Sequence, residues 1–174
     1  KKKIKVNIFS YSDYLNDGDR LDDKQFGGEP GMVIKYQNAS RAINAIKKSN
    51  PKTKVIFLTP KGKKLDNNLA KEMSKMGNIS IICGRYEGFD ERIIDQYSDL
   101  EVSIGDYIVS GGEYPAVILM DSISRMVKGV IGNEESVDND SLSNSLLKHP
   151  VYTRPAELKV GKVPKLNYYL ASFP

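Results

Sequence analysis

The chain has only one cysteine, Cys83, and one histidine, His149, among its 174 residues. A single cysteine excludes a disulfide within the chain, and this Cys/His content is too small for an ordinary zinc site. No apolar run approaches the roughly 18 residues of a membrane-spanning helix, and the first residues show no secretory hydrophobic segment. The sequence therefore predicts a soluble protein of a reducing cytoplasm, with no membrane association.

The sequence also lacks the glycine patterns that cradle nucleotide phosphates. It contains no GxxxxGK[ST] motif, and no GxGxxG stands between an expected strand and an expected helix. These absences argue against a P-loop ATPase and against a nicotinamide dehydrogenase. A nucleoside ligand of this chain would have to bind without a pyrophosphate cradle.

Charge is nearly balanced, with 26 basic and 22 acidic residues and a formal net charge of +4. Basic residues gather at 1–3 and 51–64, whereas residues 133–140 are acidic. A small positive excess favours anionic partners without identifying one.

Short β-branched runs alternate with helical patterns, which predicts one compact α/β domain with a mainly parallel sheet and helices on both faces. Asp66 and Asp90 are expected as helix N-caps and Gly77 as a C-cap. A later helix begins near Tyr114 and is expected to end at Gly129. The expected strands are 54–60, 79–84 and the start of 101–112, and the expected earlier helices are 37–49, 65–77 and 89–98. Helical spacing predicts that the last helix buries Val117, Met120, Ile123 and Val127.

Three apolar strands each run into a glycine-bearing segment, at 57–62, 83–88 and 103–112. Ligands of open parallel sheets bind outside the carboxyl ends of the strands, so these segments are expected to line one crevice. Bare glycine backbone there can read the edge of a flat heterocycle such as adenine. The apolar walls of this crevice would come from Leu58, Pro60, Ile104 and Val109.

Four motifs carry a family resemblance: FGGEPGM (26–32), GRYEGFDER (84–92), SIGDYIVSGGE (103–113) and YTRP (152–155). In this order and separation they closely resemble the bacterial tRNA (guanine-N1)-methyltransferases of the SPOUT class, over nearly the whole chain. The resemblance implies S-adenosylmethionine as methyl donor and the guanine immediately 3′ of the tRNA anticodon as substrate. It also implies a deep trefoil knot at the cofactor pocket and a homodimer with active sites at the interface.

The resemblance assigns cofactor-binding positions to the three glycine-bearing segments and to the helix start that follows them. Their alternative role is plain turn and strand-end structure. The matching residues are Leu58, Thr59, Pro60, Gly84, Tyr86, Glu87, Ile104, Gly105, Asp106, Tyr107, Ile108, Val109, Gly111, Gly112 and Pro115.

Two further residues match the catalytic positions of the family. Asp140 matches the general base that removes the proton from guanine N1, and Arg125 matches the residue that stabilises negative charge at guanine O6. Without the resemblance, Asp140 is one of many loop acids and Arg125 a helix residue spaced to pair with Asp121. The family's use of Mg²⁺ makes Glu87 or other loop acids candidate ligands, although no spacing identifies them.

The resemblance divides the chain into a knotted cofactor-binding domain at 1–132, a mobile loop with the base at 133–145, and a C-terminal segment at 146–174. The strand and helix that begin family members, and the tRNA-gripping domain that ends them, have no counterpart in this sequence. A cofactor- or RNA-binding dimer module without turnover therefore remains an alternative. So does a SPOUT methyltransferase for another RNA base.

Overall fold

The computed structural model describes residues 3–131 and 150–164. The chain divides into two compact units, Lys1–Val137 and Asp138–Pro174. In the second unit, β6 (Glu157–Leu158) and β7 (Gly161–Lys162) form a short antiparallel hairpin. No helix in the described ranges has the length and apolar character that crossing a membrane requires.

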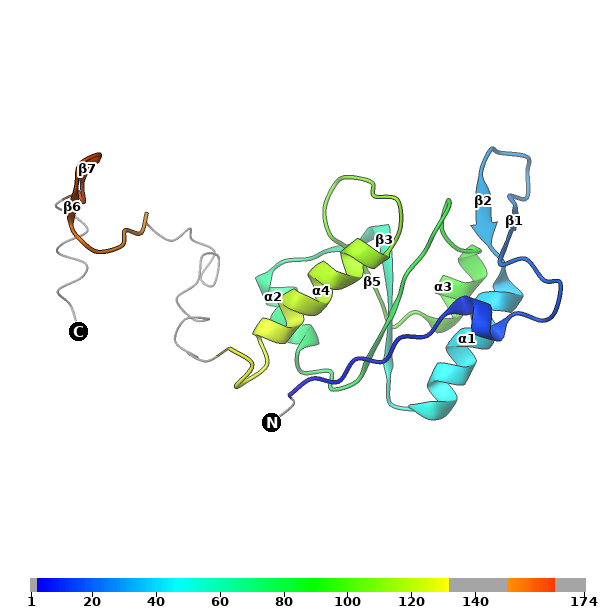
Figure 1. Ribbon diagram of the computed structural model, residues 1–174. Helices are drawn as coiled ribbons and strands as arrows, with labels where there is room; N and C mark the ends of the chain where they lie inside the picture. The colour runs from blue at the N-terminus through cyan, green and yellow to red at the C-terminus, as the bar shows by residue number, and fades with distance from the viewer. Residues whose placement is uncertain (1–2, 132–149, 165–174) are drawn as a thin grey trace. The chain divides into compact units, whose positions relative to one another are not determined.

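The first unit is built on a parallel sheet, as the alternating pattern predicts. Its strands are β3 (Lys54–Lys64), β4 (Ile79–Ile82) and β5 (Leu100–Ser103), in the order β4-β3-β5 (Figure 1). Both pairs of neighbouring strands are parallel. The crossovers contain α2 (Asn67–Met73) and α3 (Glu91–Tyr97). The sheet thus has all its described carboxyl ends at one edge.

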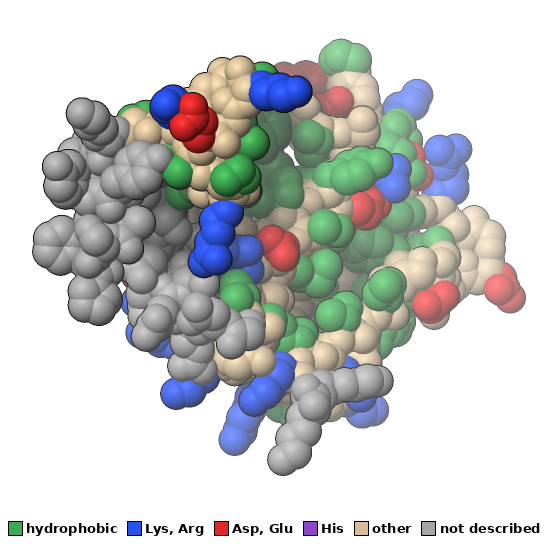
Figure 2. Space-filling model, turned by 60° about the vertical axis from the view of Figure 1, so that its left-hand side comes forward, with side chains coloured by type: hydrophobic (Ala, Val, Ile, Leu, Met, Phe, Trp, Pro, Cys, Tyr) green, Lys and Arg blue, Asp and Glu red, His purple; other side chains and the backbone are tan. Residues whose placement is uncertain are grey.

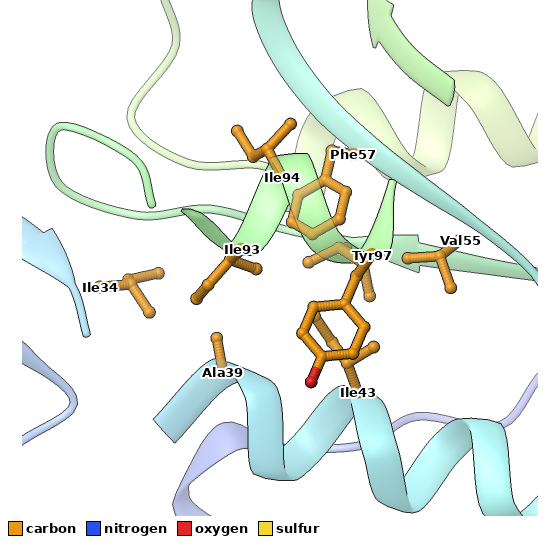
Figure 3. Packing of buried hydrophobic residues seen from close by; sticks show 9 residues of the cluster. Ile34, Ala39, Ile43, Val55, Phe57, Ile93, Ile94 and Tyr97 are labelled. Carbon is orange, nitrogen blue, oxygen red and sulfur yellow. The ribbon is translucent and has the colours of Figure 1, made fainter. Parts of the chain in front are cut away.

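Helices cover both faces of this sheet, also as predicted. Successive side chains of a strand point to opposite faces, so Val55 and Phe57 pack in one cluster and Ile56 in another. The first cluster includes residues of α1 (Tyr36–Ser49) and α3. Figure 3 shows these side chains in one cluster with Val55 and Phe57. The second includes residues of α2 and α4 (Glu113–Arg125). Each buried large side chain contributes about 1.5–3 kcal/mol by leaving water.

The N-caps expected from the sequence are present at the starts of α2 and α3. The Asp66 carboxylate accepts a hydrogen bond from the Leu69 N–H at 2.7 Å, and the Asp90 carboxylate accepts one from the Arg92 N–H at 3.1 Å. The expected C-cap at Gly77 is wrong, because α2 ends at Met73 with Ser74 as its C-cap.

The burial of α4 agrees with the spacing prediction only in part. Ile123 packs against the cluster around Ile56 and Met120 is half-buried, as predicted, but the most buried side chains are others. Leu119 is fully buried and Ala116 nearly so, whereas Val117 is 58% exposed. The helix also ends at Arg125 and not at Gly129. This helix carries two apolar stripes, and the stripe containing Leu119 faces the sheet because it fits the cluster around Ile56.

Two features of the backbone are not apparent from the sequence pattern. The segment after Leu58 is no simple loop, because β3 continues to Lys64 with a register shift between Leu58 and Lys63. Residues 59–62 are therefore an insertion within the strand. In addition, β1 (Asp22–Lys24) and β2 (Met32–Ile34) form an antiparallel hairpin whose strands are too short for periodicity to reveal.

Candidate functional site

The candidate site lies where β3, β4 and β5 end. The segment after β4 and the segment between β5 and α4 meet there, because the Gly112 N–H donates to the Gly84 carbonyl at 2.8 Å. In Figure 1 the second of these segments arches above α4 at the edge of the sheet. Two of the three glycine-bearing segments are thus directly joined.

The glycines at this junction are required by the packing of the two segments against each other. A Cβ atom on Gly112 would lie 2.7 Å from the Cys83 Cα and 2.8 Å from the Gly84 nitrogen. A Cβ on Gly84 would lie 2.9 Å from the Phe89 ring. The closest neighbours of both absent side chains are therefore protein atoms, and the glycines allow the two segments to approach.

Side chains reinforce the junction from two sides. The Arg85 Nη2 lies 2.8 Å from the Glu113 Oε1, which joins the segment after β4 to the first residue of α4. Both partners are more than half exposed, so the pair contributes at most about 1 kcal/mol. From η1 (Tyr11–Tyr14), the Tyr11 hydroxyl donates to the Cys83 carbonyl at 3.2 Å.

Burial and a nearby acid perturb the ionisable groups beneath the junction. Burial, with the charges of Cys83 and Glu113, raises the pKa of the Tyr11 hydroxyl well above its usual range. Burial and the Glu113 carboxylate raise the pKa of the Cys83 thiol to about 11. Both groups are therefore neutral at physiological pH, and Cys83 is not an activated nucleophile.

The segment from Ile104 to Val109 leaves backbone groups available to a ligand. Within residues 3–131 and 150–164, no protein acceptor is found for the N–H groups of residues 106–110. The Ile108 side chain is 78% exposed beside them. Gly105 has φ +150°, and a Cβ there would lie 2.5 Å from the Tyr107 ring. Open backbone donors beside apolar side chains suit a nucleoside with a heterocyclic edge.

The second half of β3, from Leu58 to Lys64, supplies the remaining part of the site. Leu58 and Thr59 are half-buried and Pro60 is exposed. The Lys64 Nζ lies 2.5 Å from the Asp106 carboxylate, which ties the end of β3 to the segment after β5.

The β1-β2 hairpin also contacts the site, which the sequence did not reveal. The Glu87 N–H donates to the Met32 carbonyl at 2.9 Å. A Cβ on Gly31 would lie 2.5 Å from the Glu87 Cγ. Tyr86, beside Glu87, has φ +60°, a conformation that non-glycine residues seldom adopt. The glycines of FGGEPGM are the only sequence signal of this contact.

The predicted catalytic residues occupy different parts of the chain. Arg125 is the last residue of α4 and its side chain is exposed. Asp140 lies outside the described residues, as does His149.

The remaining predicted binding residue, Pro115, is buried in the first turn of α4. Among the described residues, no group of three or more His, Cys, Asp or Glu side chains is arranged to hold a metal ion.

Comparison with known proteins assigns this arrangement to a family. Residues 1–170 match the family described as tRNA (Guanine-1)-methyltransferase TrmD. The chain is 48% identical to the tRNA (guanine-N(1)-)-methyltransferase of Caldicellulosiruptor saccharolyticus, covering 95% of this chain and 67% of that protein. It is 46% identical to the proteins of the same name from Pseudoalteromonas atlantica and Vibrio cholerae, with 94% of this chain covered. It spans 63% and 67% of their respective lengths.

Proposed function

Because the chain belongs to the tRNA (guanine-1)-methyltransferase family, we propose that it methylates N1 of a guanine in tRNA with S-adenosylmethionine as donor. The target is the guanine immediately 3′ of the anticodon, and the reaction takes place in the cytoplasm. The observation that carries this proposal is the joined pair of glycine segments at the carboxyl edge of the sheet, where Gly112 donates to Gly84.

The donor is held by the residues around this junction. Backbone N–H groups of residues 106–110 face no protein acceptor within the described ranges and are suited to the adenine edge. Leu58, Ile108 and Val109 supply apolar surface beside it. When bound, the donor supplies an electrophilic methyl group on a sulfonium centre. A deep trefoil knot in the chain around these segments belongs to the same proposal.

Two side chains act on the guanine. The proton on N1 must leave as N1 becomes nucleophilic, and the Asp140 carboxylate accepts that proton. Negative charge then develops at O6, where the fixed positive charge and planar donors of Arg125 stabilise it. If Mg²⁺ takes part, Glu87 at the junction is the candidate carboxylate ligand.

The active unit in this proposal is a homodimer. Hydrophobic side chains gather on the face of the molecule shown in Figure 2. On α4, Tyr114 is 74% and Val117 58% exposed, and Ile118 is also exposed. Exposed apolar side chains that cluster on one helix mark an interaction surface. We propose that a second copy covers this surface and that Asp140 of one subunit acts on the guanine at the donor of the other.

Titration calorimetry with S-adenosylmethionine and a tritium methyl-transfer assay on unmodified tRNA test the proposal. Asp140→Asn is expected to bind the donor with unchanged affinity and to transfer methyl groups at least about 10²-fold more slowly. Asp138→Asn, a matched change in the same acidic segment, is expected to retain activity. Donor binding without any methyl transfer by the parent chain would favour the alternative of a binding module. Transfer to a different base would favour a related methyltransferase.

A mixing experiment tests the shared site. Asp140→Ala and Gly112→Val chains are each expected to be inactive, the second because its side chain separates the joined segments. Heterodimers of the two retain one intact site and should recover activity. If heterodimers form, as shown by differently tagged chains, and remain inactive, the shared site is wrong.

A further inference from the structure

The segment that joins β5 to α4 is anchored at both ends and has few ties between them. At its start, the Ser103 hydroxyl donates to the Gly105 carbonyl at 3.1 Å. At its end, the Gly112 N–H donates to the Gly84 carbonyl at 2.8 Å. Between these anchors the side chains of residues 107–109 are exposed. Little apolar burial therefore fixes the conformation of the segment.

One ion pair ties the middle of this segment to another part of the chain. The Lys64 Nζ lies 2.5 Å from the Asp106 carboxylate. Among the residues that the structure describes, no other hydrogen bond or ion pair joins residues 106–110 to a different segment. The Tyr107 hydroxyl donates to the Ile104 carbonyl at 3.4 Å, which is a contact within the segment. Lys64 is therefore the one described side chain from outside that forms a polar contact with these residues.

The course of β3 brings Lys64 to this position. Leu58 and Lys63 both pair with Val102 of β5, so the strand returns to the same residue after its insertion. A Cβ on Gly62 would lie 2.5 Å from the Val102 nitrogen. This neighbour is a backbone atom of a paired strand, so the close return requires glycine. The backbone of β3 therefore determines where the lysine emerges, beside the segment after β5.

The ion pair is exposed, so its effect on overall stability is small. The Lys64 and Asp106 side chains are 59% and 83% exposed, and pairs of this kind contribute little to the free energy of unfolding. Its effect is instead local, on a segment with no second polar tie to the rest of the described chain. A segment that is ordered before a ligand arrives loses less conformational entropy on binding, which raises the affinity.

We infer that Lys64 is a positioning residue for the methyl donor. By binding Asp106, it keeps the backbone N–H groups of residues 106–110 in the arrangement that reads the adenine edge. This inference rests on the proposed function, because it takes the donor from there. Lys64 does not contact the donor itself, so its effect on donor affinity depends on its charge and on salt, and not on the amino acid group of the ligand.

Methylthioadenosine is the probe, because it has the adenosine and the thioether of the donor but no amino acid group and no net charge. In titration calorimetry, Lys64→Gln is expected to bind it about 1.5- to 5-fold more weakly than the parent chain. Lys64→Glu brings like charges together and should bind it more weakly still, whereas Lys64→Arg keeps the charge and should retain the parent affinity. Lys54→Gln is the matched control. It removes a similar pair with Asp99, at 2.8 Å and at the other end of β3, and should bind the probe as the parent does.

Salt dependence distinguishes electrostatic positioning from a purely structural role of the side chain. The Debye length falls from about 10 Å at 0.1 M salt to about 3 Å at 1 M, so salt weakens an exposed ion pair. The ratio of the parent affinity to the Lys64→Gln affinity should therefore fall toward one as NaCl rises to about 1 M. Because methylthioadenosine carries no net charge, this change arises in the protein and not in the ligand.

Three results would overturn the inference. The first is equal affinity of the parent, Lys64→Gln and Lys64→Glu chains for methylthioadenosine, and the second is an affinity ratio that salt does not change. The third is a loss confined to S-adenosylhomocysteine, which would mean that Lys64 binds the carboxylate of the ligand.

The same measurements separate this inference from the proposed function. A parent chain that shows the charge series with methylthioadenosine but transfers no methyl group to tRNA would remove the proposed function and leave the role of Lys64 in place. Methyl transfer by the parent with equal probe affinity in all Lys64 variants would remove only the inference. A parent chain that binds neither adenosine compound would remove both.

Discussion

Replacement of Gly112 by alanine tests whether the close approach of two backbone segments organises the site. The added Cβ would lie 2.7 Å from the Cys83 Cα and 2.8 Å from the Gly84 nitrogen. Both neighbours are backbone atoms, so the two segments have to separate. Overpacking of this kind costs about 1–3 kcal/mol. Separation also weakens the hydrogen bond from Gly112 to Gly84, a bond with a net contribution of about 0.5–1.5 kcal/mol.

One effect opposes this loss. Gly112 has φ −74°, which alanine adopts readily, and alanine at such a position stabilises a protein by about 0.4–1 kcal/mol through the unfolded state. The clash is the larger effect, so the free energy of unfolding should fall by about 1–3 kcal/mol. For a chain of this size the Tm should fall by about 2–12 °C.

Gly111→Ala is the matched control for this prediction. A Cβ at Gly111 meets the carboxylate end of Glu113 and, at 3.4 Å, the Arg85 Nε. These are ends of flexible side chains that can move aside, so its Tm should stay within about 2 °C of the parent. Thermal unfolding followed by circular dichroism, with donor titration on both variants, measures the difference. A Gly112→Ala chain as stable as Gly111→Ala would refute the packing argument.

Three further predictions concern other parts of the first unit. The Cys83 thiol has a pKa raised to about 11, so it should react with iodoacetamide at pH 8 about 10²-fold more slowly than a thiol of pKa about 8.5. Glu113→Gln should speed this reaction, because it removes a charge that raises the pKa of the thiol. Equal rates for Cys83 and a free thiol would contradict the burial described. Val117→Lys should weaken the proposed homodimer at least about 10²-fold, as measured by analytical ultracentrifugation. Ser49→Lys, on α1 at the opposite face of the sheet, should not weaken it. A Val117→Lys chain that dimerises normally would mean that the interface lies elsewhere. Asp66→Ala should lower the free energy of unfolding by about 1 kcal/mol through loss of the bond to Leu69, and an unchanged denaturation midpoint in urea would show that the cap contributes nothing.

Local patterns in the sequence were sufficient for the parallel sheet, for the helices that cover it and for the family, but not for the β1-β2 hairpin or for the ends of α2 and α4. Alternation of β-branched runs with helical spacing predicts a parallel sheet with helices on both faces, because strand and helix periodicities depend on a few consecutive residues. The caps at Asp66 and Asp90 follow from the same short range. The motifs from Phe26 to Pro155 indicated the methyltransferase family, and the comparisons confirm it. The same motifs named the candidate pocket, including Gly84 and Gly112.

Only the tertiary structure decided which side chains of these elements are buried and which distant segments are in contact. The burial of Leu119 and the exposure of Val117 depend on which apolar stripe of α4 fits the cluster around Ile56, and spacing along one helix does not contain that information. The contact of Gly112 with Gly84 and the exposure of Phe26 likewise join or separate residues far apart in the chain. Contacts of this kind are set by the volume and hydrogen bonds that distant segments share, and those exist only once the sheet has brought the segments together.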